Sequence, residues 1–125
     1  MENTMTSNPF ISTPASVEHV TQGIPVIDCN CPDNIPFHLA EDLRAVELGA
    51  PLKIVGAKTM DKVSKEGNRY TVMYLRTDKG LFQTCSLSFI RRIDKILTDV
   101  AEPTITLLLK YNSTGNAYLS CAVTL

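Results

Sequence analysis

The chain has 125 residues and a formal net charge of −1, and 44% of its residues are hydrophobic. This length suits one domain with a real core, and no stretch approaches the roughly 18 consecutive apolar residues that a membrane span requires. The first residues lack the basic and hydrophobic stretches of a secretion signal. We therefore expect a cytoplasmic protein that does not enter the membrane.

The charges are distributed unevenly along the chain. Residues 1–48 carry seven acids and one base, which gives −6, whereas residues 49–92 carry nine bases and three acids, which gives +6. Phosphate binding depends on the local positive potential and not on the total charge. The basic stretch therefore favours a surface that binds a polyanion, and a merely solvated surface is the alternative.

The first part of the chain is predicted to be an irregular arm. Five prolines interrupt residues 1–36, and proline disfavours long regular elements. One short strand is expected at Ile24–Asp28. Phe37–Leu48 has a moderate helical pattern that Gly49 would end, with a loose turn as the alternative. We expect an arm over residues 1–36 and a folded domain over residues 37–125.

Three strands are predicted next, at Leu52–Thr59, Arg69–Arg76 and Leu81–Cys85. The first alternates between its two faces, and Gly56 is placed for a sharp bend within it. The second is rich in aromatic and β-branched residues, which favour strands. Met60–Asn68 between them is predicted to be a polar, lysine-bearing loop.

An amphipathic helix and two more strands complete the predicted order. The apolar residues that repeat at helical spacing are Phe89, Ile93, Ile96, Leu97 and Val100. Ser86 or Ser88 can cap this helix, and Pro103 follows its end. Thr104–Tyr111 and Ala117–Leu125 are the last two strands. The order β-β-β-α-β-β predicts a mainly β fold, the five-stranded OB barrel.

No catalytic or metal-binding motif accompanies this order. The chain lacks a Gly-rich phosphate loop, an H-E-x-x-H motif and a nucleophile elbow. Cys29 and Cys31 are closer together than the C-x-x-C spacing of common zinc and redox motifs. A metal site of Cys29, Cys31 and His38 and a Cys29–His38 nucleophile pair are the alternatives. We expect neither, and predict a protein without enzymatic activity or cofactor.

Binding of unpaired nucleotides requires aromatic faces for the bases and cations for the phosphates. The aromatic candidates are Tyr70, Tyr74, Phe82, Tyr111 and Tyr118. Strand alternation places Tyr70 and Tyr74 on one face, which we predict to be the outer, binding face, and burial of Tyr74 in the core is the alternative. Phe82 either continues that face or fills the barrel. Tyr111 and Tyr118 flank the last turn, where one stacks on a base or the two pack on each other.

The cationic candidates lie within the basic stretch. They are Lys53, Lys58, Lys62, Lys65, Arg69, Arg76 and Lys79. The lysines of Met60–Asn68 are favoured because a flexible loop can wrap a strand, and plain solubility of an exposed loop is the alternative. Arg91 and Arg92 begin the helix, and we predict them to be salt-bridge or interface residues.

The chain from residue 52 onward also carries a pattern shared with a known family. Its parts are Leu52-Lys53-Ile54-Val55, Gly67-x-x-Tyr70, Asp78-x-Gly80, Ile93-x-x-Ile96-Leu97 and Gly115-Asn116-Ala117-Tyr118-Leu119-Ser120. By this pattern, residues 52–125 resemble the OB-fold single-stranded DNA-binding proteins of protein-primed Bacillus phages and Gram-positive mobile elements. The opening Met1-Glu2-Asn3-Thr4 is similar to one phage member, and residues 5–50 match nothing in the pattern.

The resemblance implies a DNA-binding protein that coats single-stranded DNA during replication of a phage or mobile element, largely independently of sequence. Its location would then be the host cytoplasm. RNA as a ligand, and homo-oligomerisation through the N-terminal arm, are left open. The main alternative is a non-enzymatic OB-fold module for protein–protein interaction or regulation, whose acidic front binds a basic partner. A structural domain of a virion is a third.

Overall fold

The computed structural model of the protein describes residues 24–124. Most of the predicted irregular arm lies outside these residues. The described chain divides into two compact units, Met60–Thr71 and Pro25–Thr59 with Val72–Leu125. We call the first the hairpin unit and the second the sheet unit. Residues 25–36, which were predicted to belong to the arm, share the sheet unit with residues 37–59.

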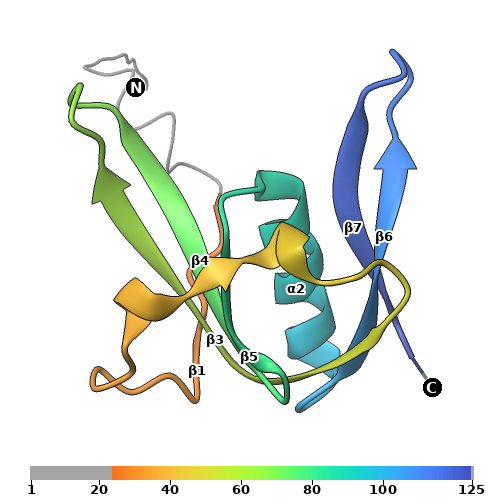
Figure 1. The fold of residues 1–125 in the computed structure, drawn as a ribbon, viewed down its shortest axis with the longest axis horizontal. Helices are drawn as coiled ribbons and strands as arrows, with labels where there is room; N and C mark the ends of the chain where they lie inside the picture. Colours follow the sequence, from red (N-terminus) through yellow and green to blue (C-terminus); the bar gives the residue numbers. More distant parts are fainter. Residues whose placement is uncertain (1–23, 125) are drawn as a thin grey trace, which may run out of the picture. The chain divides into compact units, whose positions relative to one another are not determined.

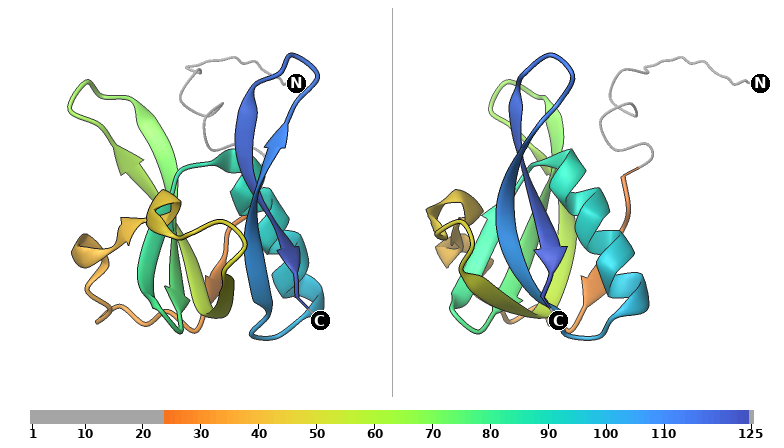
Figure 2. Two further views of the ribbon diagram at one scale, coloured as in Figure 1. Left: turned by 45° about the vertical axis from the view of Figure 1, so that its right-hand side comes forward. Right: turned by 90° about the vertical axis from the view of Figure 1, so that its right-hand side faces the viewer.

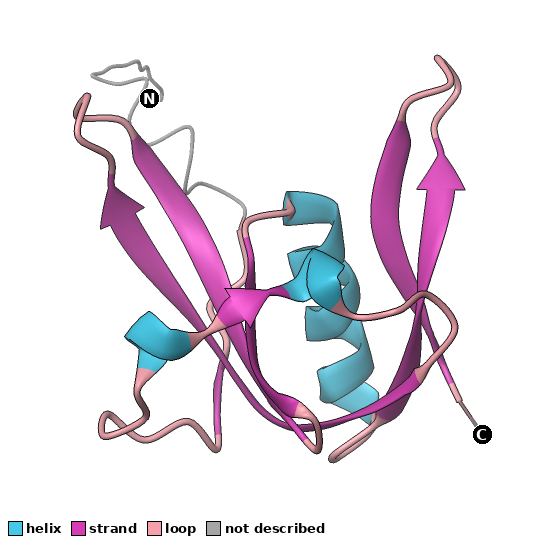
Figure 3. Ribbon diagram, viewed as in Figure 1, coloured by secondary structure: helices cyan, strands magenta, loops and turns pink. Residues whose placement is uncertain are grey.

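Strands make up most of the regular structure of the described residues, which also contain one α-helix (Figures 1 and 3). The elements in chain order are β1 (Asp28–Cys29), η1 (Phe37–Leu39), β2 (Glu41–Asp42), η2 (Leu43–Ala45), β3 (Pro51–Val63), β4 (Arg69–Thr77), β5 (Gly80–Thr84), α2 (Leu87–Asp99), β6 (Thr104–Tyr111) and β7 (Ala117–Val123). From β3 onward the predicted order β-β-β-α-β-β is confirmed.

The strands form a mixed sheet with the neighbour order β2-β5-β4-β3-β6-β7, and β1 pairs with β3 beside this path. Within the sheet unit β3 and β6 pair only over Pro51–Lys53 and Thr104–Thr106, whereas β6 and β7 pair along most of their length. A closed barrel requires the strands at the two ends of the path to pair with each other. Here the path ends at β2, which pairs with β5, and at β7, which pairs with β6. Within the described residues β2 and β7 do not pair with each other, so the sheet is curled but open, a half-barrel.

The helix α2 supplies much of the core of the sheet unit. Ser86 is its N-cap, as predicted, and its Oγ accepts a hydrogen bond from the Phe89 backbone N–H at 3.4 Å. Three residues of the predicted apolar stripe, Phe89, Ile93 and Ile96, are buried, as is Ile90, which was not part of the prediction. Leu97 is only partly buried, and Val100 is exposed beyond the last turn.

The helix also contacts the last strand through a polar side chain. Arg92 Nε donates a hydrogen bond of 3.1 Å to the Cys121 carbonyl of β7, and Figure 2 shows α2 beside this strand. Arg92 therefore joins α2 to β7 by a hydrogen bond to a backbone carbonyl, which differs from the predicted salt-bridge or interface role. Cys121 is buried, and burial raises the pKa of its thiol to about 11.

Strand β3 extends beyond its predicted end. Met60–Val63 belong to the strand, not to the loop, because the turn of the hairpin unit is confined to Ser64–Asn68. Ser64 N–H donates to the Asn68 carbonyl at 2.8 Å, and Ser64 Oγ accepts from Asn68 N–H at 3.1 Å. Gly67 has a φ of 88°, which glycine adopts without strain. Backbone pairing therefore extends through a polar sequence that lacks a strand pattern.

The predicted helix over Phe37–Leu48 is wrong. Two 3-10 turns, η1 and η2, flank the short strand β2, in agreement with the alternative of a loose turn. Glu41 and Asp42 pair with Phe82 and Gln83 of β5. This tertiary pairing requires extended backbone in the middle of the helical pattern, so it overrides the local preference.

The short strand predicted at Ile24–Asp28 lies slightly later, as β1 at Asp28–Cys29. It pairs antiparallel with Lys58 and Ala57 of β3. A Cβ atom at Gly56 would collide with the Asn30 carbonyl oxygen and lie 3.0 Å from the Cys29 carbonyl oxygen. Gly56 therefore permits a close approach of two backbones.

Candidate nucleic-acid interface

The predicted binding face of the sheet unit is crossed by residues 30–40, which we call the strap. The strap begins after β1, which pairs with β3, and it ends at β2, which pairs with β5. Since β4 lies between β3 and β5 in the sheet, the strap passes over β4 (Figure 1). Gln83 Nε2 of β5 donates a hydrogen bond of 3.0 Å to the Ala40 carbonyl at the end of the strap.

Tyr74 lies on this face but is not exposed. It is the cross-strand partner of Gln83, so the two side chains share the face that the strap covers. The Phe37 ring packs on Tyr74 with a centroid distance of 4.7 Å and an interplanar angle of 43°, and Tyr74 is only 5% exposed. The prediction of an outward, open platform is therefore wrong at Tyr74, because the strap buries the ring.

Two predicted cations also contact the strap. Lys58 Nζ lies 3.1 Å from a carboxylate oxygen of Asp33, and this hydrogen-bonded partner raises the pKa of Lys58. Lys58 Nζ also lies 6.0 Å from the centre of the Phe37 ring. Arg76 donates a hydrogen bond from Nη1 to the Asn30 carbonyl. The strap therefore connects Lys58, Tyr74 and Arg76, three predicted site residues.

Phe82 fills the interior of the half-barrel, which was one of its two predicted positions. It pairs across the sheet with Leu75, and cross-strand partners project to the same face. Both residues are buried. Phe82 is therefore a core residue and offers no ring to a ligand on the strap side.

Lys53 and Lys79 form a separate pair of contacts near the β4–β5 turn. Lys53 Nζ lies 3.6 Å from Glu102, and its backbone N–H donates to Asp78 at 3.0 Å. Lys79 Nζ donates to the Pro51 carbonyl at 2.6 Å. Each of the two lysines therefore already holds a structural partner.

Tyr111 and Tyr118 lie on opposite faces of the β6–β7 hairpin. Tyr111 pairs with Ala117, whereas Tyr118 pairs with the neighbouring Lys110. Successive residues of a strand alternate between faces, so the register rules out mutual packing of the two rings. Tyr111 is 67% exposed. Lys110, an exposed cation beside Tyr118, was not among the predicted candidates.

The hairpin unit holds the remaining predicted residues. These are Lys62, Lys65, Arg69 and Tyr70. Thr71 Oγ1 donates to Asp61 at 3.0 Å on one face of the hairpin, and alternation turns Tyr70 to the other face, where it is 38% exposed. The unit therefore combines a half-exposed aromatic ring with three cations.

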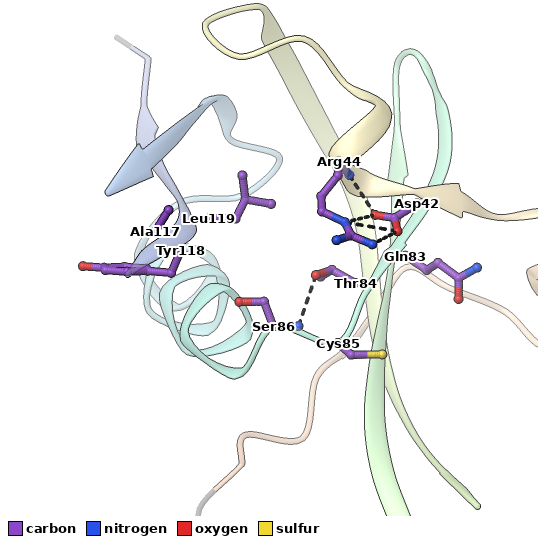
Figure 4. A pocket seen from close by; sticks show the side chains of 9 residues that line it. All are labelled: Asp42, Arg44, Gln83, Thr84, Cys85, Ser86, Ala117, Tyr118 and Leu119. Atoms are coloured by element: carbon purple, nitrogen blue, oxygen red, sulfur yellow. Dashed lines mark hydrogen bonds and ion pairs between the residues drawn. The ribbon is translucent and has the colours of Figure 1, made fainter. Parts of the chain in front are cut away.

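A cleft of about 470 Å³ lies in the sheet unit between the end of β5 and the start of β7 (Figure 4). It is the open side of the half-barrel. Asp42 and Arg44 form an ion pair of 2.7 Å on one wall, where the hydrogen bonds from Arg44 lower the pKa of Asp42 to about 2. Thr84 and Ser86 also line the cleft, and the Tyr118 ring points away from the ion pair (Figure 4).

Only weak sequence signals point to the strap. Proline flanks Phe37 on one side, and Gly56 interrupts an alternating strand, but the sequence does not reveal that these two residues belong to one contact region. Asn30 has a φ of 53°, a left-handed conformation that asparagine tolerates. This conformation lies at the point where β1 ends and the strap begins.

Within residues 24–124, no three His, Cys, Asp or Glu side chains are grouped so that they could hold a metal ion. The described chain also contains no helix of the length and apolar character needed to cross a bilayer.

No protein-family model, curated protein or solved structure matches the chain.

Proposed function

We propose that the protein coats single-stranded DNA during replication of a phage or mobile element, with little sequence preference and without catalysis. The observation that carries this proposal is the hairpin unit, where the half-exposed Tyr70 lies in a short segment with Lys62, Lys65 and Arg69. A ring for base stacking and cations for phosphates are the two requirements of non-specific single-strand binding.

The fold and the charge distribution give further support. A curled β sheet with a helix between its third and fourth long strands is compatible with an OB barrel, which commonly binds oligonucleotides. Residues 49–92 carry the basic excess, and this range includes the hairpin unit. The resemblance of residues 52–125 to phage single-stranded DNA-binding proteins agrees with this fold and with this charge distribution.

A protein–protein interaction module is the second candidate. The strap supports it, because the sheet face that would hold an oligonucleotide is covered by the chain itself. The pairing of β2 with β5 and the cleft beside it leave a further side of the half-barrel open to a peptide. A basic partner would complement the acidic residues 1–48.

Titration with fluorescent oligo(dT) separates the two candidates. We expect submicromolar binding to oligo(dT) at low salt and much weaker binding to a duplex of the same length, because stacking on protein rings requires unpaired bases. Fluorescence anisotropy measures both affinities. The absence of binding up to about 100 µM, the weak end of ordinary non-specific affinity, would contradict the proposal and favour the interaction module.

Tyr70 provides a local test of stacking. Replacement of Tyr70 by alanine is expected to weaken oligo(dT) binding by about 1–3 kcal/mol, since one base would lose its aromatic partner. Replacement by phenylalanine keeps the ring and should retain most of the affinity. Tyr70 is partly exposed at the hairpin, so both variants should keep the wild-type circular dichroism spectrum. Equal affinities of the alanine and phenylalanine variants would exclude Tyr70 as a stacking platform.

A further inference from the structure

We propose that the strap occupies a nucleotide subsite made by Lys58, Tyr74 and Arg76, and that single-stranded DNA displaces the strap to bind there. This inference rests on the proposed function and adds a site and its regulation. The strap presents one aromatic ring, one carboxylate and one carbonyl oxygen to the three side chains. A nucleotide presents the same kinds of groups, as a base and phosphate oxygens.

The aromatic contact is the first part of this correspondence. Phe37 covers Tyr74 at a centroid distance of 4.7 Å, within the range of ordinary aromatic pairs. A nucleobase stacks on tyrosine through the same π face. Phe37 and a base therefore compete for contact with the Tyr74 ring, and the burial of Tyr74 by the strap is compatible with a binding role.

The polar contacts are the second part. Arg76 donates to a neutral carbonyl of Asn30 and Lys58 pairs with Asp33. A phosphodiester offers charged oxygens to both cations, and charge-assisted hydrogen bonds are stronger than neutral ones. The Asp33 side chain is 98% exposed, whereas the Lys58 side chain is 17% exposed, so water screens the carboxylate of this ion pair and weakens the pair. DNA can therefore replace both partners with better ones.

The strap buries few of its own side chains. The flanking strands β1 and β2 have two residues each, and between them Cys31 is the one buried side chain of residues 30–40, while Leu39 is 66% exposed. Segments with few buried apolar contacts open at a low free-energy cost. The chain can thus release the strap while β3, β4 and β5 stay folded.

The close approach at Gly56 places the strap at a fixed position. Any side chain at residue 56 would meet the Asn30 carbonyl, the same group that accepts the hydrogen bond from Arg76. The missing Cβ therefore brings this carbonyl into reach of Arg76. The strap has a defined closed state, from which opening is a discrete step.

The first arm of the test weakens the closed state. The variant Asp33→Asn/Phe37→Ala removes the carboxylate on Lys58 and the ring on Tyr74, but leaves the three proposed site residues in place. The apparent affinity of a covered site equals the affinity of the open site multiplied by the fraction of molecules that are open. The variant is open more often and should therefore bind oligo(dT) about fivefold more tightly. The matched control Leu39→Ala/Glu47→Gln also removes one large apolar side chain and one carboxylate, both from exposed positions, and should bind as the wild type does.

The second arm uses Cys31, which is buried in the strap. In a Cys29→Ser/Cys85→Ser background, the exposed thiols are absent. Cys121 is buried and has a pKa of about 11, so it reacts slowly with maleimide at neutral pH. Saturating oligo(dT) should accelerate the modification of Cys31 about tenfold, because bound DNA holds the strap open. Peptide mass spectrometry identifies the modified cysteine.

The two arms distinguish this inference from the proposed function. Tighter binding by the strap variant together with faster Cys31 modification supports displacement. Oligo(dT) binding that leaves Cys31 modification unchanged or slower, or that is no tighter in the strap variant, overturns the inference and leaves the proposed function intact. A flat anisotropy titration with every variant, including the one with the weakened strap, overturns both.

Discussion

Replacement of Ile93 by alanine is expected to lower the free energy of unfolding by about 2–5 kcal/mol. Ile93 lies in the middle of α2 and is fully buried, together with Phe89 and Ile90 one turn before it. Loss of its outer carbon atoms removes burial and leaves a cavity in a close-packed core. The higher helix propensity of alanine offsets only a few tenths of a kcal/mol. Urea denaturation followed by circular dichroism measures the change.

The exposed Lys95 on the same helix provides the control. Lys95→Ala alters no buried group and should change the stability by less than about 0.5 kcal/mol. A loss below about 1 kcal/mol for Ile93→Ala would mean that α2 does not pack into the half-barrel in solution. The same measurement would then contradict the arrangement in which Arg92 contacts the Cys121 carbonyl.

The regular part of the fold could be predicted because its signals are local. The buried face of α2 follows from helical spacing at Phe89, Ile93 and Ile96, and the helix is capped by Ser86, one of the two predicted caps. The strands β6 and β7 are separated by a turn in which Asn112 Oδ1 accepts from the backbone N–H groups of Thr114 and Asn116. Such turn chemistry is visible in sequence, so the position of this hairpin was correct.

The closure of the sheet could not be predicted, because it depends on which edges pair. The order β-β-β-α-β-β is shared by a closed barrel and by the half-barrel seen here. The edge of β5 pairs with Glu41 and Asp42, two residues that have no strand pattern of their own. Assignment to the OB fold in particular stays a prediction, supported by element order and by the path of the sheet.

In the candidate site, too, the local arrangement could be predicted from the sequence and the contacts between distant residues could not. Sequence alternation correctly placed Tyr74 and Arg76 on one face of β4, but not the chain that covers them. The contacts of the strap join residues far apart in sequence: Lys58 meets Asp33 over a separation of 25, and Arg76 meets Asn30 over 46. A charge count treats Lys58 and Arg76 as available cations, whereas the structure gives each a partner.

The dependence of DNA binding on salt is expected to be steep. If about four cations contact phosphates, the slope of log K against log salt for a single strand is about −2.8, and affinity for oligo(dT) falls about 50-fold between 50 and 200 mM NaCl. The physical cause is the release of the counterions condensed on DNA. Replacement of Lys62 and Lys65 by alanine should reduce the slope to about −1.4, because the variant loses two of the four cations that contact phosphates. Anisotropy titrations at four salt concentrations give the slopes.

A second double variant tests whether these contacts are local. Arg91→Ala/Lys95→Ala removes the same total charge from the exposed face of α2, which carries no residue of the proposed site. Its slope should equal that of the wild type, since counterion release counts the cations in contact with phosphates and not the net charge of the protein. An unchanged slope in the hairpin variant would exclude Lys62 and Lys65 from the phosphate path. A slope that falls equally in both variants would show that a diffuse field attracts the DNA, with no defined track through the hairpin unit.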